Sequence, residues 1–112
     1  MEDTIKIKFH YPAGRNAVIF KVCNVYYFYL HESFSGDTVY CANCRIGHRT
    51  FRVEMIKLKS NLWCFHVERK EKMFLDSRIG NKYYHSAGEA HNGLLTAFSK
   101  KLNKTLVYDY NI

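Results

Sequence analysis

Residues 38–67 of the chain read TVYCANCRIGHRTFRVEMIKLKSNLWCFHV, and this stretch decides the fold. From Arg49 to Leu58 most apolar residues occupy every second position, which is typical of a strand with one buried face. Lys59-Ser60-Asn61 has the composition of a turn. Leu62 to Glu68 then reads as a returning strand, so the stretch predicts an antiparallel hairpin.

The same stretch carries four residues with the spacing of a metal site. Cys41 and Cys44 form a C-x-x-C pair, whose two intervening residues let the backbone turn so that both sulfurs face one centre. Cys64 and His66 lie two residues apart on the returning strand, and therefore on one face. The predicted hairpin brings the two pairs close in space. The sequence thus predicts a structural Zn²⁺ ion held by these four side chains, with His48 as the substitute ligand.

Two other interpretations of the cysteines stay open. Free cysteine is among the most buried residue types, so the thiols could simply belong to the core. Cys41 and Cys44 could alternatively form a disulfide or redox pair, although the βαβ setting of a thioredoxin-like motif is not visible. Cys23 lies outside the pattern in an apolar run, and we interpret it as an ordinary core thiol.

The rest of the chain predicts more antiparallel strands and one helix. The predicted strands are 4–9, 17–23, 25–30, 38–40, 73–75 and 105–110. Ser86 to Glu89 has the pattern of a capping box, and an apolar stripe follows it as far as Leu102, with Asn103 as the stop. We therefore expect an α+β fold, a twisted antiparallel β-sheet with a zinc site at one end and one C-terminal helix, about 86–102, packed on the sheet.

The size and composition of the chain fit one globular unit. With 112 residues, positions 1–112 are expected to form a single zinc-binding β-rich domain. Nine Tyr, eight Phe and one Trp supply a core and exclude a disordered chain. The acidic start Met-Glu-Asp and the lack of a long apolar run predict neither a signal peptide nor a membrane span. An intracellular, nuclear location is expected.

Charge is the second global feature. Seventeen Lys and Arg against ten Asp and Glu give a net charge of +7, and most of the excess lies in residues 41–82, around the metal motif. Such a patch attracts phosphate backbones, and a neighbouring aromatic ring such as Tyr40 could stack on bases. A solvated face that only keeps the protein soluble is the other interpretation. The predicted nucleic-acid contacts are Arg45, His48, Arg49, Arg52, Lys57 and Lys59.

Some segments between residues 14 and 68 carry a family resemblance. They are Gly14-Arg15 leading into Val18-Ile19-Phe20, Tyr26-Tyr27, Ser35 to Cys41, and Cys64-Phe65-His66. In this order they resemble the WRKY, GCM and FLYWCH group of zinc-binding β-domains, which are eukaryotic DNA-binding modules and their transposase-derived relatives. The resemblance implies zinc ligation by Cys41, Cys44, Cys64 and His66, and it favours DNA over RNA. No segment resembles the WRKY heptapeptide, so no base-contacting residue is implied.

These observations together favour a nucleic-acid-binding zinc module, most simply the DNA-binding domain of a transcription or chromatin factor. The first alternative is a protein–protein interaction module, an adaptor or a viral or regulatory factor, that uses the aromatic sheet or the helix face. An RNA-binding domain is the second alternative. Catalysis is not expected, because four good ligands would close the coordination sphere of the metal.

Overall fold

The computed structural model describes residues 3–10, 19–22 and 26–108, with side chains for residues 3–9 and 35–107. Cys23 and the resemblance residues Gly14, Arg15 and Val18 lie outside the described residues. So do the outer parts of the strands predicted at 17–23 and 105–110.

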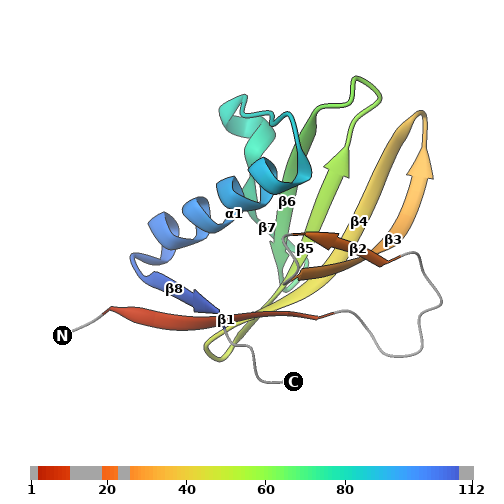
Figure 1. Cartoon of the computed structure of the whole chain (residues 1–112). Coiled ribbons are helices and arrows are strands. Elements are labelled where there is room, and N and C mark those ends of the chain that lie inside the picture. The colour runs from red at the N-terminus through yellow and green to blue at the C-terminus, as the bar shows by residue number, and fades with distance from the viewer. Residues whose placement is uncertain (1–2, 11–18, 23–25, 109–112) are drawn as a thin grey trace.

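The described chain forms eight strands and one long helix (Figure 1). The helix α1 spans Ala87–Leu102, and a short 3-10 helix η1 spans Ser77–Gly80. The strands are β1 Thr4–His10, β2 Ile19–Val22, β3 Tyr26–Phe34, β4 Asp37–Ile46, β5 Arg49–Lys57, β6 Trp63–Arg69, β7 Lys72–Asp76 and β8 Thr105–Tyr108. This confirms the predicted α+β class, a mostly antiparallel sheet with a C-terminal helix packed on it.

The strands pair in the order β2-β3-β4-β5-β6-β7, and all of these neighbours are antiparallel. Strand β4 is long enough to share one edge between two partners. Its first half pairs with β3, from Asp37 to Cys41, and its second half pairs with β1, from Asn43 to Ile46. Strand β8 adds to the other side of β1 as a parallel partner. In Figure 1, β1 and β8 consequently lie together beyond the ends of β2 and β3.

One prediction about β4 needs correction. The sequence pattern predicted that the strand ends at Tyr40 and that Cys41 to Cys44 form a turn. Instead the strand continues without a break to Ile46, and Cys41 and Cys44 pair with Glu54 and Phe51 of β5. The C-x-x-C segment is therefore extended, because it is hydrogen-bonded to neighbouring strands on both sides.

The core lies between α1 and one face of the sheet, which we call the helix face. Side chains of a strand alternate between faces, and alternate residues of β4, β5 and β6 point toward the helix. The aromatic contacts are close: Phe98 of α1 lies 5.2 Å from Phe51 and 5.9 Å from Phe74, measured between ring centroids. The predicted helix stripe contributes Ala90, Leu94 and Phe98, all fully buried, and His91 is buried beside them.

Local interactions fix where the helix begins and ends. The Ser86 side chain accepts a hydrogen bond from the Glu89 amide, as the capping box predicted. The Glu89 carboxylate also reaches back, but it accepts from the His85 amide, one residue before the N-cap. Asn103 ends the helix in a left-handed conformation with φ 53°. Just before the helix, Tyr84 forms a two-bond bridge with Trp63 at the start of β6. This bridge anchors the start of α1 at the end of the sheet where β6 begins.

No helix in the described part of the chain is long and apolar enough to cross a membrane.

The packing of Tyr84 on α1 leads to a prediction about two helical glycines. A Cβ added at Gly93 would overlap the Tyr84 ring, 2.7 Å from Cε1, whereas at Gly88 it would meet nothing closer than the Ser86 Oγ at 3.9 Å. Alanine normally stabilises a helix by up to about 1 kcal/mol relative to glycine. We expect Gly88→Ala to raise the free energy of unfolding and Gly93→Ala to lower it by about 1–3 kcal/mol. Urea unfolding of both variants measures the difference, and a stabilised Gly93→Ala protein would contradict this packing.

Candidate functional site

The predicted metal ligands do not all lie on the same face of the sheet. Residues three apart in a strand point to opposite faces, so the extended conformation of β4 separates Cys41 from Cys44. Cys44 points to the helix face and packs in the main core. Cys41 points to the opposite face, which we call the far face, and forms a small apolar cluster there with Val39, Ile56 and Cys64.

The strand register also separates the candidates that share the far face. Cys41 pairs with Glu54, and Glu54 pairs with His66, so β5 lies between the cysteine and the histidine. Two strand spacings separate the backbones of Cys41 and His66 by about 9.6 Å. A zinc ion needs the ligand atom of each residue within about 2.3 Å of the metal. In the described residues no three His, Cys, Asp or Glu side chains form a group that could hold a metal ion. The four predicted ligands therefore do not fit a zinc ion in this structure.

The thiols themselves have the environment of core side chains. Cys41, Cys44 and Cys64 are all buried, and the three are not disulfide-bonded. Burial raises the pKa of Cys44 far above its usual range, and burial also raises the pKa of Cys64 to about 11. Metals bind thiolates, which these environments disfavour. The structure agrees with the alternative in which these cysteines belong to the core. His48, the proposed substitute ligand, is exposed in the turn between β4 and β5.

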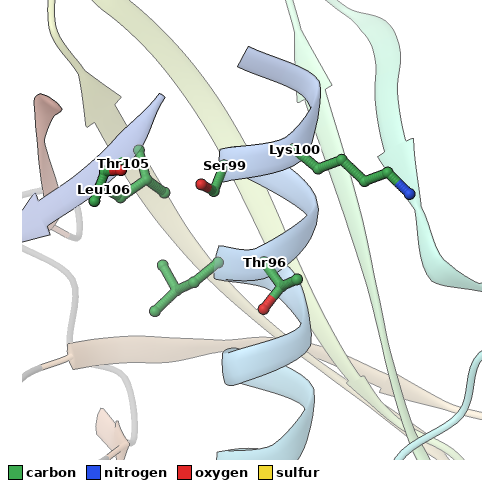
Figure 2. A pocket seen from close by; sticks show the side chains of 6 residues that line it. Thr96, Ser99, Lys100, Thr105 and Leu106 are labelled. Atoms are coloured by element: carbon green, nitrogen blue, oxygen red, sulfur yellow. The ribbon is translucent and has the colours of Figure 1, made fainter. Parts of the chain in front are cut away.

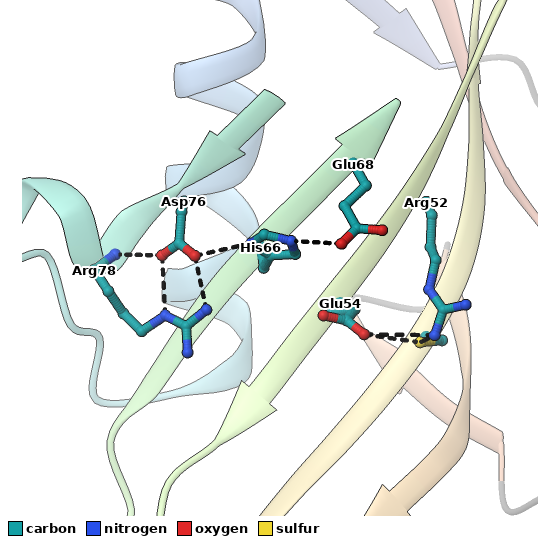
Figure 3. Close-up of polar contacts among 7 residues, drawn as sticks. Arg52, Glu54, His66, Glu68, Asp76 and Arg78 are labelled. Carbon is teal, nitrogen blue, oxygen red and sulfur yellow. Dashed lines mark hydrogen bonds and ion pairs between the residues drawn. The ribbon is translucent and has the colours of Figure 1, made fainter. Parts of the chain in front are cut away.

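A network of charged side chains surrounds His66 on the far face (Figure 3). Its Nδ1 lies 2.8 Å from Asp76 Oδ2, and its Nε2 lies 3.0 Å from Glu68 Oε1. Only the imidazolium form can donate through both nitrogens at once. The Arg78 side chain in turn donates two hydrogen bonds to Asp76, at 3.0 and 2.7 Å. His66 is thus the centre of a four-residue ion network that joins β6, β7 and η1.

The network changes the proton affinities of its members. Burial opposes the ionisation of His66, but the hydrogen bonds to Asp76 and Glu68 outweigh it and raise its pKa above the usual value. For Asp76, burial favours the neutral acid, but hydrogen bonds from Arg78 and His66 lower the pKa to about 2. Both shifts stabilise the charged forms. We assign the network a structural role, because every charge in it is matched within the protein.

Sequence analysis missed Glu68, Asp76 and Arg78. Glu68 could have been found from the strand alternation that placed Cys64 and His66 on one face. Asp76 could not, because an irregularity between Val67 and Glu68 shifts the register of β6 against β7. Without the register, the sequence does not show which residue of β7 lies opposite His66.

The structure divides the predicted nucleic-acid contacts into three groups. Arg45, His48 and Arg49 are exposed at the β4–β5 turn. Arg52 lies on the far face, where its Nη2 is 3.5 Å from Glu54 and 3.4 Å from the Cys41 sulfur, so its charge is partly neutralised. Lys57 and Lys59 lie near the other end of β5, roughly 26 Å from Arg49 along the strand. The six residues do not form one surface.

A different set of cations gathers around the β4–β5 turn. The β6–β7 turn, the end of α1 and the start of β1 lie at the same end of the molecule, which we call the basic end (Figure 1). Its described Lys and Arg residues are Lys6, Arg45, Arg49, Arg69, Lys70, Lys72, Lys100, Lys101 and Lys104. The described acidic residues there are Asp3, Glu68 and Glu71. The sequence showed the charge run at Arg69 to Lys72 and the lysines that end the helix, but not that the fold brings them together.

Two small clefts open on this end. The first has a volume of about 280 Å³ and lies between β1, the β4–β5 turn and the residues after α1, with Arg49, His48 and Lys104 at its rim. The second, also about 280 Å³, is lined by Arg69, Lys70 and Lys72 together with Met73 and Phe74. The second cleft thus presents three cations to a phosphate group, and the first presents Arg49 and Lys104, of which Lys104 also lies 3.5 Å from Asp3. We refer to the two clefts as the β4–β5 cleft and the β6–β7 cleft.

A third hollow, of about 440 Å³, lies between α1 and β8 (Figure 2). Leu95, Ser99 and Leu106 line it, and the Ser99 hydroxyl hydrogen-bonds the Lys104 carbonyl. Lys100 is at its rim, but its ammonium group points away from β8. The hollow therefore presents hydroxyl and apolar groups without a charged group directed into it.

The arrangement of the cysteines predicts how the protein responds to chelators. Because Cys44 faces away from Cys41, Cys64 and His66, folding should not depend on a zinc ion. We expect an excess of EDTA to leave the thermal unfolding curve unchanged. A structural zinc ion would instead contribute on the order of 10 kcal/mol, so its removal would unfold the protein. Unfolding by EDTA, together with one equivalent of zinc in elemental analysis, would contradict the structure.

The raised pKa of His66 predicts a pH-dependent contribution to stability. The contribution should be complete below pH 6.5, the usual imidazole pKa, and should be lost as the pH rises through the raised value. His91 acts in the opposite direction, since burial lowers its pKa to about 4. The contribution of neutral His91 to the free energy of unfolding is lost as the pH falls from 6.5 toward that value.

Comparison with His66→Gln isolates the His66 contribution, because His91 is present in both proteins. The difference in unfolding free energy between wild type and variant should be largest below pH 6.5 and should decrease toward pH 8. Urea unfolding across this range measures it. A difference that does not change with pH would show that His66 is not charged in the network.

Comparison of the chain with protein-family models, with curated proteins and with solved structures finds no match.

Proposed function

We propose that the protein binds nucleic acid through its basic end. The observation that supports this most directly is the convergence of cations from separate parts of the chain. Lys and Arg residues from β1, the β4–β5 turn, the β6–β7 turn and the end of α1 meet there, and few acidic residues accompany them. A surface of this kind attracts a polyanion and releases the counterions bound to it.

The shape of the surface adds to this argument. At the β4–β5 cleft, the apolar residues Ile46 and Leu102 line the same hollow as Arg49 and Lys104. An exposed cation that only improves solubility needs no such cleft. Long cationic side chains can keep their charged groups in solvent while their methylene groups pack on apolar neighbours. Phosphate groups could then be held by several cations at once.

The protein–protein alternative has less support. Of the described large apolar side chains, those with high exposure are Met73, Ile79, Tyr83 and Val107. They belong to β7, η1, the segment before α1, and β8, and Tyr83 is the one aromatic residue among these four. A docking interface normally centres on a cluster of buried aromatic or aliphatic anchors. Zinc has no part in the proposal, and the sheet and helix alone form the scaffold.

A pair of charge-matched variants tests the proposed surface. Arg49→Gln with Lys72→Gln removes one cation from each cleft, whereas Lys57→Gln with Lys59→Gln removes two cations from the opposite end. We expect the first pair to weaken binding to a short labelled DNA duplex roughly tenfold or more at about 50 mM salt. The slope of log K against log salt concentration should fall by about 2, one unit for each lost phosphate contact.

The second pair is the control, and it should change both the affinity and the salt slope much less. Fluorescence anisotropy titrations at several salt concentrations between about 50 and 200 mM provide both quantities. Equal losses for the two pairs would mean that binding reflects net charge alone. No measurable binding of the wild type to duplex or single-stranded nucleic acid would overturn the proposal.

A further inference from the structure

The two cationic clefts both adjoin the end of α1. The Lys101 Nζ donates a hydrogen bond of 2.6 Å to the Phe74 carbonyl, and Phe74 lines the β6–β7 cleft. Leu102 and Lys104 line the β4–β5 cleft. The β4–β5 and β6–β7 turns lie two strand spacings apart in the sheet, which puts the two clefts about 10 Å apart.

That separation is comparable with a groove of double-stranded DNA. The major groove of B-form DNA is about 12 Å wide and admits a helix, and its two walls are the phosphate backbones of the two strands. The corresponding groove of A-form RNA is narrow and deep, and side chains cannot read it. Two clefts about 10 Å apart that both adjoin a helix end are therefore better matched to the two strands of a DNA duplex than to one strand or to duplex RNA.

Among the residues whose side chains the structure describes, the aromatic rings of the core beside the basic end and Tyr40 are packed within the protein. Phe51 and Phe98 are fully buried in the core. Lys101 lies over the Phe74 ring, with its Nζ 4.5 Å from the ring centroid. Tyr40, the ring that the sequence offered for stacking, packs against Trp63 at a centroid distance of 5.9 Å. Proteins that hold single strands without sequence preference usually depend on exposed aromatic rings for stacking, about 1–3 kcal/mol per base.

We infer that the ligand of the basic end is the backbone of double-stranded DNA, with one strand in each cleft and the end of α1 next to both. This inference rests on the proposed nucleic-acid function. Because the core rings beside the basic end and Tyr40 are packed within the protein, we expect affinity to follow the density of phosphate charge, and a duplex carries one charge per roughly 1.7 Å of its axis. Contacts to phosphates position the protein but carry no sequence information, so binding should be largely independent of sequence.

The test compares duplex DNA, each of its single strands and duplex RNA of the same length and sequence, each by anisotropy with the full chain. We expect duplex DNA to bind roughly tenfold more tightly than either single strand at about 50 mM salt, and more tightly than duplex RNA. Two duplexes of unrelated sequence should bind within about a factor of two of each other. A single strand bound as tightly as the duplex would overturn the inference but leave nucleic-acid binding intact.

The single variants test the assignment of one strand to each cleft. Arg49→Gln and Lys72→Gln should each weaken duplex DNA binding, and each should lower the salt slope by about 1. Lys57→Gln, at the far end of β5, is the control for one lost charge. If only one of the two cleft variants weakens binding, the two-strand arrangement is wrong. If the wild type binds none of the nucleic acids, the proposed function itself fails, which is a separate outcome.

Discussion

The continuous hydrogen bonding of β4 is the constraint on which the rest of the structure depends. This one strand pairs with β3 and β1 along one edge and with β5 along the other. Because it is held on both sides, the segment from Cys41 to Cys44 has no freedom to fold into a turn. Strict alternation along β4 then decides which side chains enter the core and which reach the far face. Residues that pair with β4 on neighbouring strands point to the same face as their partners, so the alternation extends across the sheet.

The alternation separates the chemistry of the molecule by face. The helix face takes the large apolar side chains and Cys44, and α1 covers them. The far face takes two thiols and a group of ionised residues around His66, and each of those ions has a partner of opposite charge within the protein. Matched charges of this kind stabilise local geometry. Because the opposite charges largely cancel, they exert only a weak electrostatic attraction on a ligand. Most of the other described Lys and Arg residues lie at the basic end, where, among the described side chains, Lys104 alone has a carboxylate partner, Asp3, at 3.5 Å.

Local patterns in the sequence predicted the elements that depend on neighbouring residues. The hairpin of β5 and β6, the capping box at Ser86 and the helix stop at Asn103 are all confirmed. The predicted turn from Cys41 to Cys44 is wrong, because C-x-x-C spacing is equally compatible with a turn and with a strand. Pairing with β1, some 35 residues earlier, decides between them, and the spacing contains no information about it. The partners of His66 were missed for the same reason, since they depend on a register that is irregular.

The basic end is a consequence of topology more than of local composition. In an antiparallel meander, every second turn lies at the same end of the sheet, so the β4–β5 and β6–β7 turns are neighbours. The bridge between Tyr84 and Trp63 starts α1 at the opposite end, and the helix returns along the sheet to the basic end. Lysines in its last turn are favoured by the helix dipole, and there they join the cations of the two turns. Four segments far apart in sequence thus make one charged surface, because the same pairing that buries the cysteines also fixes where each turn lies.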